Sequence, residues 1–205
     1  MKQQSNLRKQ TPSQTVGPFF AYGLTPRQYS YPFKPVMENN LVTSGVSGEH
    51  ITIRGRIFDG EDIPIADALI EIWQADSFGA LDHASKGQGN SAKDTIGFKG
   101  FGRCGTGSKE PGTFTFQTIK PGIIAGSSAP WISVTVFMRG LLSHVFTRIY
   151  FSDEAKKNQK DDLLSSVPAD RRNTMIAERT VENNCVYYDF TIYMQGDRET
   201  VFLDV

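Results

Sequence analysis

The sequence predicts a mainly β protein: an Ig-like or transthyretin-like β-sandwich with an extended N-terminal arm, long loops and one or two short helices. Three observations predict this fold. Short segments of alternating apolar and polar residues recur from residue 51 onward, turn signals separate them, and no repeat of 20–50 residues interrupts the pattern. A chain of 205 residues is long enough for one well-buried domain. We therefore expect an arm over 1–50 and one β domain over 51–205.

The first 50 residues are rich in proline and aromatic residues. Proline fixes φ and removes a backbone donor, so we expect neither a helix nor a central strand in this segment. Its many tyrosine and phenylalanine rings argue against a disordered tail. We expect an arm that buries its rings against its own domain or against a partner chain. The prolines that set this pattern are Pro12, Pro18, Pro26, Pro32 and Pro35.

The strands expected in the domain share an alternating or β-branched pattern and are bounded by turn residues. They cover 51–58, 68–73, 112–119, 131–138, 145–151 and 186–194, with a short last one at 200–203.

Two helical pieces are expected between these strands. One runs from 152 to about 160, because Ser152 and Asp153 can accept hydrogen bonds from free helix N–H groups. The other covers 168–179, since Pro168 suits a first helical turn. The glycine- and serine-rich stretches 77–100 and 122–128 are expected to be long loops, which often carry function.

Composition excludes several classes of protein. Lys+Arg and Asp+Glu both number 22, and no run of like charge reaches five residues, which argues against a nucleic-acid surface. No stretch approaches the roughly 20 apolar residues of a membrane span, and the polar N-terminus lacks a secretion signal, so we expect a cytoplasmic protein. Cys104 and Cys185 fit no zinc spacing. Two reduced thiols are the favoured interpretation, with a disulfide as the alternative.

The sequence contains no self-evident catalytic motif. Its three histidines, His50, His83 and His144, have no partner at a metal-binding spacing. There is no Gly-x-Ser-x-Gly elbow. The glycine-rich run 105–108 lacks the Gly-Lys ending of a phosphate loop, and a β-hairpin loop explains it better. Residue chemistry alone therefore indicates a β domain without an assigned reaction.

Two places remain of interest. Arg139 follows an apolar strand and precedes Gly140, which suits a guanidinium that meets an anion; the alternative is an ordinary solvated arginine. Gly17 and Pro18 join the arm to two phenylalanines, where glycine would let another group approach the backbone closely. The alternative there is a simple bend.

Six segments, taken together and in order, resemble the intradiol ring-cleavage dioxygenases, and most of all the α subunits of the members that act on protocatechuate. The resemblance spans nearly the whole chain. It rests on TPSQTVGPFFAYGL (11–24), IRGRIFDGEDIPIADALIEIWQAD (53–76), FGRC (101–104), FTFQTIKPG (114–122), VFTRIYFSDEA (145–155) and GDRETVFLDV (196–205).

The resemblance implies a reaction and a cofactor. Such enzymes cleave 3,4-dihydroxybenzoate with O2 to 3-carboxy-cis,cis-muconate in the β-ketoadipate pathway of aromatic compound catabolism. Their catalytic chains hold Fe(III) with two tyrosines and two histidines, hard donors that suit a ferric ion.

The positions that match those ligands carry other residues here. A tyrosine follows the Lys-Pro-Gly turn in catalytic chains, where this chain has Ile124, and the histidine pair is replaced by Trp131 and Ser133. The loop before FGRC contains no tyrosine. The resemblance therefore implies no metal-ligating and no catalytic residue in this chain, with the Fe(III) held by a partner β subunit.

The same resemblance implies a role for the arm and for the end of one strand. Thr15, Gly17, Pro18 and Arg139 match α-subunit residues near the substrate, where Arg139 would offset the charge of the substrate carboxylate and the others would shape the pocket wall. The two subunits would share one fold, pair, and assemble into a higher hetero-oligomer. One departure is PWISV at 130–134, where α chains often carry Pro-His; this change concerns packing.

Two alternatives are kept. A non-catalytic β-sandwich binding module explains the strands and the missing ligands, but not the arm together with Arg139. A catechol dioxygenase acting on its own is disfavoured by the missing tyrosines and histidines.

Overall fold

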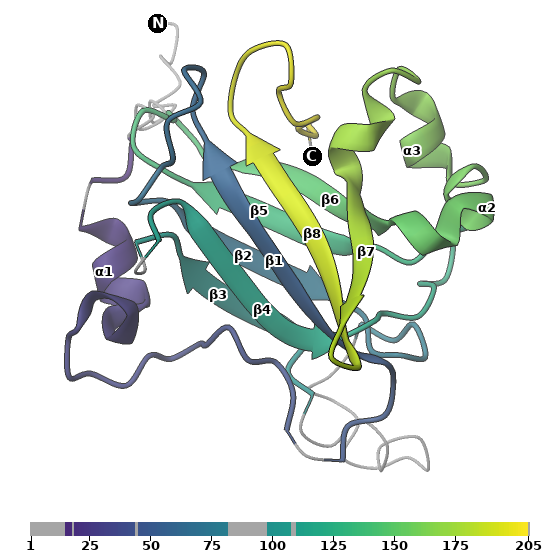
Figure 1. Ribbon diagram of the computed structural model, residues 1–205, viewed down its shortest axis with the longest axis horizontal. Helices are drawn as coiled ribbons and strands as arrows, with labels where there is room; N and C mark the ends of the chain where they lie inside the picture. The colour runs from purple at the N-terminus through teal and green to yellow at the C-terminus, as the bar shows by residue number, and fades with distance from the viewer. Residues whose placement is uncertain (1–14, 18, 44, 82–97, 108–109, 205) are drawn as a thin grey trace, which may run out of the picture.

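The fold is built from two four-stranded layers. The computed structural model describes residues 15–17, 19–43, 45–81, 98–107 and 110–204. In Figure 1 the layer β4-β1-β8-β7 lies in front of the layer β3-β2-β5-β6. A short parallel pairing of β6 with β7 joins the two layers into one run of eight strands. The front strands are β1 (His50–Phe58), β4 (Thr113–Ile119), β7 (Ile176–Glu182) and β8 (Cys185–Tyr193), and the rear strands are β2 (Leu69–Gln74), β3 (Phe101–Gly105), β5 (Ile132–Phe137) and β6 (Val145–Phe151). The mainly β prediction is confirmed, while the Ig-like or transthyretin-like label stays a prediction.

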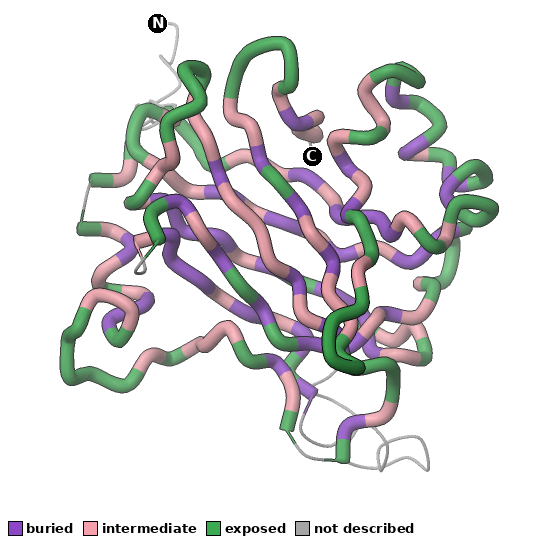
Figure 2. The backbone as a smooth tube through the Cα atoms, viewed as in Figure 1, coloured by how far each residue is buried: buried purple, intermediate pink, exposed green. Residues whose placement is uncertain are grey.

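The core lies between the layers because strand residues alternate between two faces. Every second residue of β5 is buried, from Ile132 to Val136, and β1 contributes Ile51, Ile53 and Ile57 to the same cluster. Figure 2 shows the buried positions recurring along the strands, with exposed residues concentrated in the connections. The alternation in the sequence thus has a direct cause in the packing of the two layers.

Close contact between β1 and β8 depends on Gly55. The two strands pair in parallel, with Gly55 opposite Phe190. A Cβ atom at position 55 would lie 1.8 Å from the Phe190 carbonyl oxygen. A side chain at position 55 would therefore force the two backbones apart.

The helical segments are short. They are α1 (Phe20–Leu24), η1 (Pro26–Tyr29), η2 (Ser152–Glu154), α2 (Ala155–Asn158), α3 (Asp162–Ser166) and η3 (Arg172–Met175). No helix among the described residues is long and apolar enough to cross a membrane. Both cysteines are free thiols, as favoured above; Cys104 is buried and Cys185 is exposed.

Several local predictions were wrong. The helix expected over 168–179 is reduced to η3, because the chain from Ile176 instead pairs with β8 as strand β7. The helix expected to reach residue 160 ends at Asn158, and a separate helix, α3, begins after Asp161. The strand expected at 200–203 is a single bridge between Leu203 and Phe146. Strand β3 was not predicted.

The arm also differs from the prediction, because it contains α1 and η1. Pro26 occupies the start of η1, where a missing N–H costs nothing. The Phe20 ring lies 5.5 Å from the Phe137 ring of β5. The Gln28 side chain accepts a hydrogen bond from the Gly105 N–H at 2.6 Å and donates one to its carbonyl at 3.0 Å. The described part of the arm is thus tied to β3 and β5 of its own domain.

Candidate functional site

The structure brings the arm and the end of β5 together. Gly140 has a φ of 88°, in the left-handed region that glycine adopts without strain, and the chain turns there. The Gly140 N–H donates a hydrogen bond of 3.1 Å to Oγ1 of Thr15, which is 125 residues away in the sequence. Thr15 and Arg139, both predicted site residues, therefore lie at one place on the surface.

Arg139 is held by a carboxylate. Its Nε atom forms an ion pair with Oδ2 of Asp67, two residues before β2. The Asp67 side chain is 15% exposed and that of Arg139 is 61% exposed. The alternative of an ordinary solvated arginine is therefore incomplete, because Nε contacts a carboxylate while most of the side chain faces solvent.

Gly17 and Pro18 are less informative. The Gly17 carbonyl accepts a hydrogen bond from the Phe20 N–H at 3.1 Å, which leads the chain into α1. A Cβ at Gly17 would meet none of the described atoms within 4 Å. If another group approaches the Gly17 backbone closely, that group therefore does not come from the described part of this chain. Pro18 lies outside the described residues. That these residues contact a substrate stays a prediction.

The positions that match the iron ligands form a second cluster. The Ile124 carbonyl accepts a hydrogen bond from the Ser127 N–H at 2.9 Å, and the Trp131 Nε1–H donates to Oγ of Ser127 at 3.2 Å. Ser133 lies opposite Arg148 in the pairing of β5 with β6. The Arg148 guanidinium carbon lies 3.8 Å from the centre of the Trp131 ring, a cation–π contact. An arginine and an indole thus occupy this face of the rear layer.

A buried carboxylate ties this cluster to α3. Asp161 accepts hydrogen bonds from the Tyr150 hydroxyl at 2.8 Å, the Ser127 hydroxyl at 3.0 Å and the Leu164 N–H at 3.1 Å, the last of which caps α3. Burial works to raise the pKa of Asp161, but these hydrogen bonds outweigh it and hold the pKa below its usual value. Burial is the main cause that raises the pKa of Tyr150. Asp161 is therefore an ionised anchor for the loop at 122–131.

These side chains do not fit a ferric ion. Ile124 and Trp131 offer no donor atom for a metal, Ser133 offers only a hydroxyl, and Arg148 adds a positive charge beside them. Among the described residues, no group of three or more His, Cys, Asp or Glu side chains could hold a metal ion. Of the histidines, His83 lies outside the described residues. His50 is bonded to the Val46 carbonyl, and the His144 ring lies between those of Phe137 and Phe146.

The Lys-Pro-Gly turn before Ile124 is fixed by charge. Nζ of Lys120 lies 2.7 Å from Oδ2 of Asp153 and 3.0 Å from Oε1 of Glu154. Burial alone would lower the pKa of Lys120, but its hydrogen bonds to the two carboxylates raise it. Burial likewise opposes ionisation of Asp153 and Glu154, and their cationic partners nevertheless lower both pKa values. The turn is thus anchored to η2, which directly follows β6.

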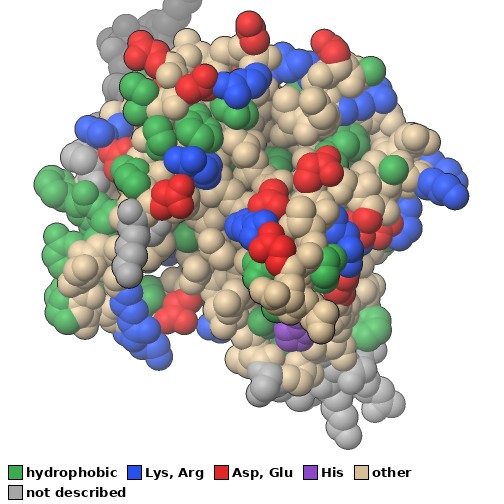
Figure 3. Space-filling model, in the orientation of Figure 1, with side chains coloured by type: hydrophobic (Ala, Val, Ile, Leu, Met, Phe, Trp, Pro, Cys, Tyr) green, Lys and Arg blue, Asp and Glu red, His purple; other side chains and the backbone are tan. Residues whose placement is uncertain are grey.

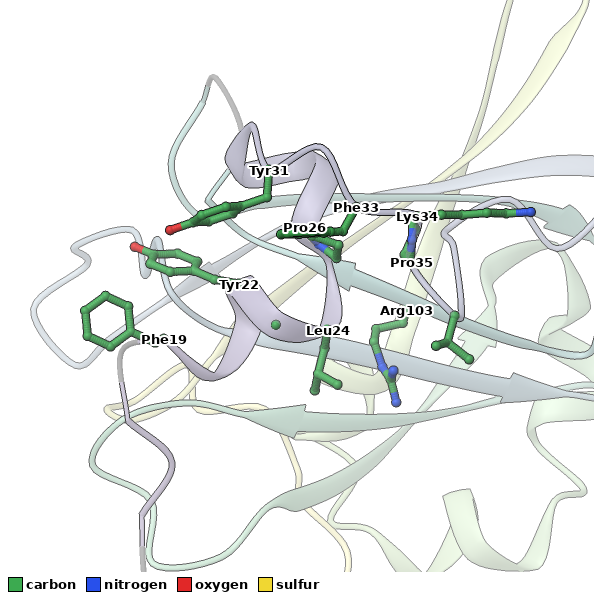
Figure 4. Close-up of a pocket in the computed structure, with 11 residues that line it drawn as sticks. Phe19, Tyr22, Leu24, Pro26, Tyr31, Phe33, Lys34, Pro35 and Arg103 are labelled. Carbon is green, nitrogen blue, oxygen red and sulfur yellow. The ribbon is translucent and has the colours of Figure 1, made fainter.

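The arm also encloses an apolar hollow of about 390 Å³. Figure 4 shows its side chains coming from α1, the following turn, the proline-rich segment and Arg103 of β3. Several of its rings are open to solvent; Phe19 is 73% and Phe33 is 65% exposed. Figure 3 shows hydrophobic side chains gathered on the side of the molecule where α1 lies in Figure 1, while charges of both signs are interspersed elsewhere on that face. Exposed apolar clusters of this kind mark interaction surfaces.

Sequence reasoning missed Asp67 and Arg148. Arg148 could have been suspected from strand pairing, since it falls opposite Ser133 once β5 and β6 are aligned. Asp67 carries no local signal, because its partner is 72 residues away and only the fold brings the two together.

Comparison with known proteins agrees with this architecture. A protein-family model described as Dioxygenase matches residues 34–130. The chain is 46% identical to the protocatechuate 3,4-dioxygenase alpha chain of Burkholderia cepacia, over 96% of this chain and 98% of that one. It is 35% identical to the alpha chain of Pseudomonas putida, over 97% and 98%. It is 29% identical to the beta chain of Burkholderia cepacia, over 78% and 71%.

A solved structure of a dioxygenase domain has a similar fold. The dioxygenase domain of a dioxygenase carbohydrate-binding protein fusion from Streptomyces sp. SirexAA-E superposes with a TM-score of 0.60 at 26% identity, over 94% of this chain and all of that one.

Proposed function

Because the chain belongs to the intradiol dioxygenase family and is a subunit of such an enzyme, we propose that it is the subunit of a protocatechuate 3,4-dioxygenase that holds no iron. The observation that carries the proposal is the residue set at the positions of the iron ligands, in a chain that matches alpha chains over nearly its whole length. These positions hold Ile124, Trp131 and Ser133, and Arg148 stacks on Trp131 and lies opposite Ser133. The Fe(III) belongs to a partner β chain.

The holoenzyme cleaves 3,4-dihydroxybenzoate between its two hydroxylated carbons. Both atoms of O2 enter the product, 3-carboxy-cis,cis-muconate, so no other oxidant is required. The ferric ion of the β chain supplies the ring-opening chemistry when it is bound. This chain contributes binding and exclusion of water, because its own described side chains do not fit the metal.

Arg139 binds the carboxylate of the substrate. Its exposed guanidinium can donate two parallel hydrogen bonds to a carboxylate, a geometry that lysine cannot reproduce. A hydrogen bond to a charged group of this kind contributes about 1.5–3 kcal/mol. Thr15, Gly17 and Pro18 shape the wall beside it, and the hydrogen bond from Gly140 to Thr15 supports this arrangement.

The β chain covers the side of the molecule that carries the arm. The exposed rings around the hollow begin at Phe19, four residues after Thr15, so the two surfaces are continuous along the chain. Interface cores are enriched in aromatic residues and depleted of charge. Covering this side would bury the rings and close the pocket at Arg139 in one step, and the αβ pair assembles into a higher hetero-oligomer.

Co-expression with a β-like chain tests the proposal. The chain purified alone should contain little iron and consume no O2 with protocatechuate, whereas the co-purified complex should be burgundy and active. The control is the β-like chain expressed alone. An active, iron-loaded homo-oligomer of this chain would contradict the assignment.

A further inference from the structure

The ion pair between Asp67 and Arg139 has an unusual division of exposure. Asp67 is largely buried and Arg139 is mostly exposed, although the two side chains are in contact. The contact uses Nε of the guanidinium. Among the described residues, no other carboxylate lies within 4.0 Å of that guanidinium. The largely buried acid therefore contacts the Nε side of the guanidinium, while most of the arginine side chain remains exposed.

Asp67 sits where three parts of the fold meet. It precedes β2, its partner follows β5, and the Tyr29 ring of the arm is close enough for the Asp67 charge to act on it. Burial is the main cause that raises the pKa of Tyr29 to about 12, and the neighbouring charges of Tyr22 and Asp67 add to it. Asp67 is only 15% exposed at this junction, so it can serve as a support for the more exposed arginine.

We propose that Asp67 is a positioning residue: it holds Nε of Arg139 so that the two terminal nitrogens face the substrate carboxylate as a preformed planar fork. This inference rests on the proposed function. A free arginine loses rotamer freedom when it binds, and a preorganised fork loses less of it for each hydrogen bond formed. Asp67 makes no contact with the substrate itself, and it acts only through Arg139.

The test is a double-mutant cycle in the reconstituted complex with the β chain. Asp67→Asn should raise KM for protocatechuate about fivefold and change kcat less than about twofold, and it should have no further effect when Arg139 is already alanine. Catechol, which lacks the carboxylate, reports on the same ring cleavage; neither substitution should alter its turnover. The matched control is Asp62→Asn, which removes an exposed ion pair with Arg198 and should leave both substrates unaffected.

The outcomes separate this inference from the proposed function. If Arg139→Ala leaves KM for protocatechuate unchanged, the proposed pocket role of this chain fails. If Arg139→Ala raises KM but Asp67→Asn does not, only the positioning role fails. The positioning role would also be overturned if Asp67→Asn raised KM for protocatechuate equally in the wild-type and Arg139→Ala backgrounds. A change in catechol turnover on Asp67→Asn would overturn it as well.

A second variant covers the case in which Asp67→Asn does not assemble. Arg139→Lys keeps the charge and leaves Asp67 in place, but it removes Nε and the fork. It should raise KM for protocatechuate as Arg139→Ala does. A wild-type KM for this variant would show that charge alone suffices, and the positioning role would be wrong.

Discussion

Replacing Asp161 by alanine should destabilise the protein strongly. The substitution removes the acceptor of three hydrogen bonds, from Tyr150, Ser127 and Leu164. It also removes the N-cap of α3. The loop at 122–131 would lose its link to the helix, and a buried tyrosine hydroxyl would lose its acceptor.

The magnitude follows from these contacts. Loss of the cap costs about 1 kcal/mol. A buried hydroxyl left without its acceptor costs about 1–3 kcal/mol, and the Ser127 bond adds about 1 kcal/mol. The total of about 4 kcal/mol corresponds to a Tm lower by about 8–16 °C for a chain of this size. Asp161→Asn, the matched control, keeps an oxygen at the cap and should lose only about 1–2 kcal/mol.

Denaturant unfolding at pH 7 and at low pH is the assay, with protein concentration held constant. Because the folded-state pKa of Asp161 lies below its ordinary value of 3.8, the carboxylate stabilises the fold above pH 3.8. That contribution is lost as the pH falls through the folded-state pKa, so wild type and alanine variant should converge in acid. Equal stability of the two at pH 7 would refute the reasoning.

Three further predictions concern other parts of the chain. Gly55→Ala should lower stability by more than about 3 kcal/mol or prevent folding, because the added Cβ meets the Phe190 carbonyl; circular dichroism during thermal unfolding measures this, and a Tm near wild type would contradict it. Arg139→Ala should raise KM for protocatechuate about 10–100-fold with little change in Tm, measured as O2 uptake by the complex; an unchanged KM would remove this residue from the pocket. Lys120→Met should cost about 1–3 kcal/mol at pH 7, because it removes the ammonium group that pairs with both Asp153 and Glu154. Since the pKa of Asp153 is lowered, this loss should fade below pH 3.8 in denaturant titrations, and a loss that is constant with pH would contradict it.

The sequence predicts those elements whose pattern is local. Strand β5 alternates because it is buried on one face, and this alternation is visible without the fold. Strand β3 was missed because Gly102 and Gly105 interrupt any pattern; it forms because β2 supplies a partner and the arm covers it. Strand β7 was taken for helix because Pro168 and the polar residues after it suit a helix start, while the pairing with β8 that decides the outcome is a tertiary contact.

The candidate site also contains some residues that the sequence marks and some contacts that only the fold creates. Arg139 and Thr15 were predicted, because a strand end and a recognisable arm motif mark them in the sequence. Their hydrogen-bonded junction at Gly140 and the support from Asp67 depend on residues far apart in the chain. Contacts between residues so far apart in the chain depend on how the two layers pack, and no local sequence pattern predicts them.

The stacked pair of Arg148 and Trp131 would hinder the construction of a ferric site at positions 124, 131 and 133. Placing tyrosine at Ile124 and histidine at Trp131 and Ser133 would not suffice to build such a site, because Arg148 lies opposite Ser133 and would place a cation against an incoming ferric ion. Removing Arg148 first would take away the cation–π partner of Trp131 before any ligand had replaced it. A change of any one of these residues alone would therefore build no ferric site, and the removal of Arg148 would also cost the cation–π contact.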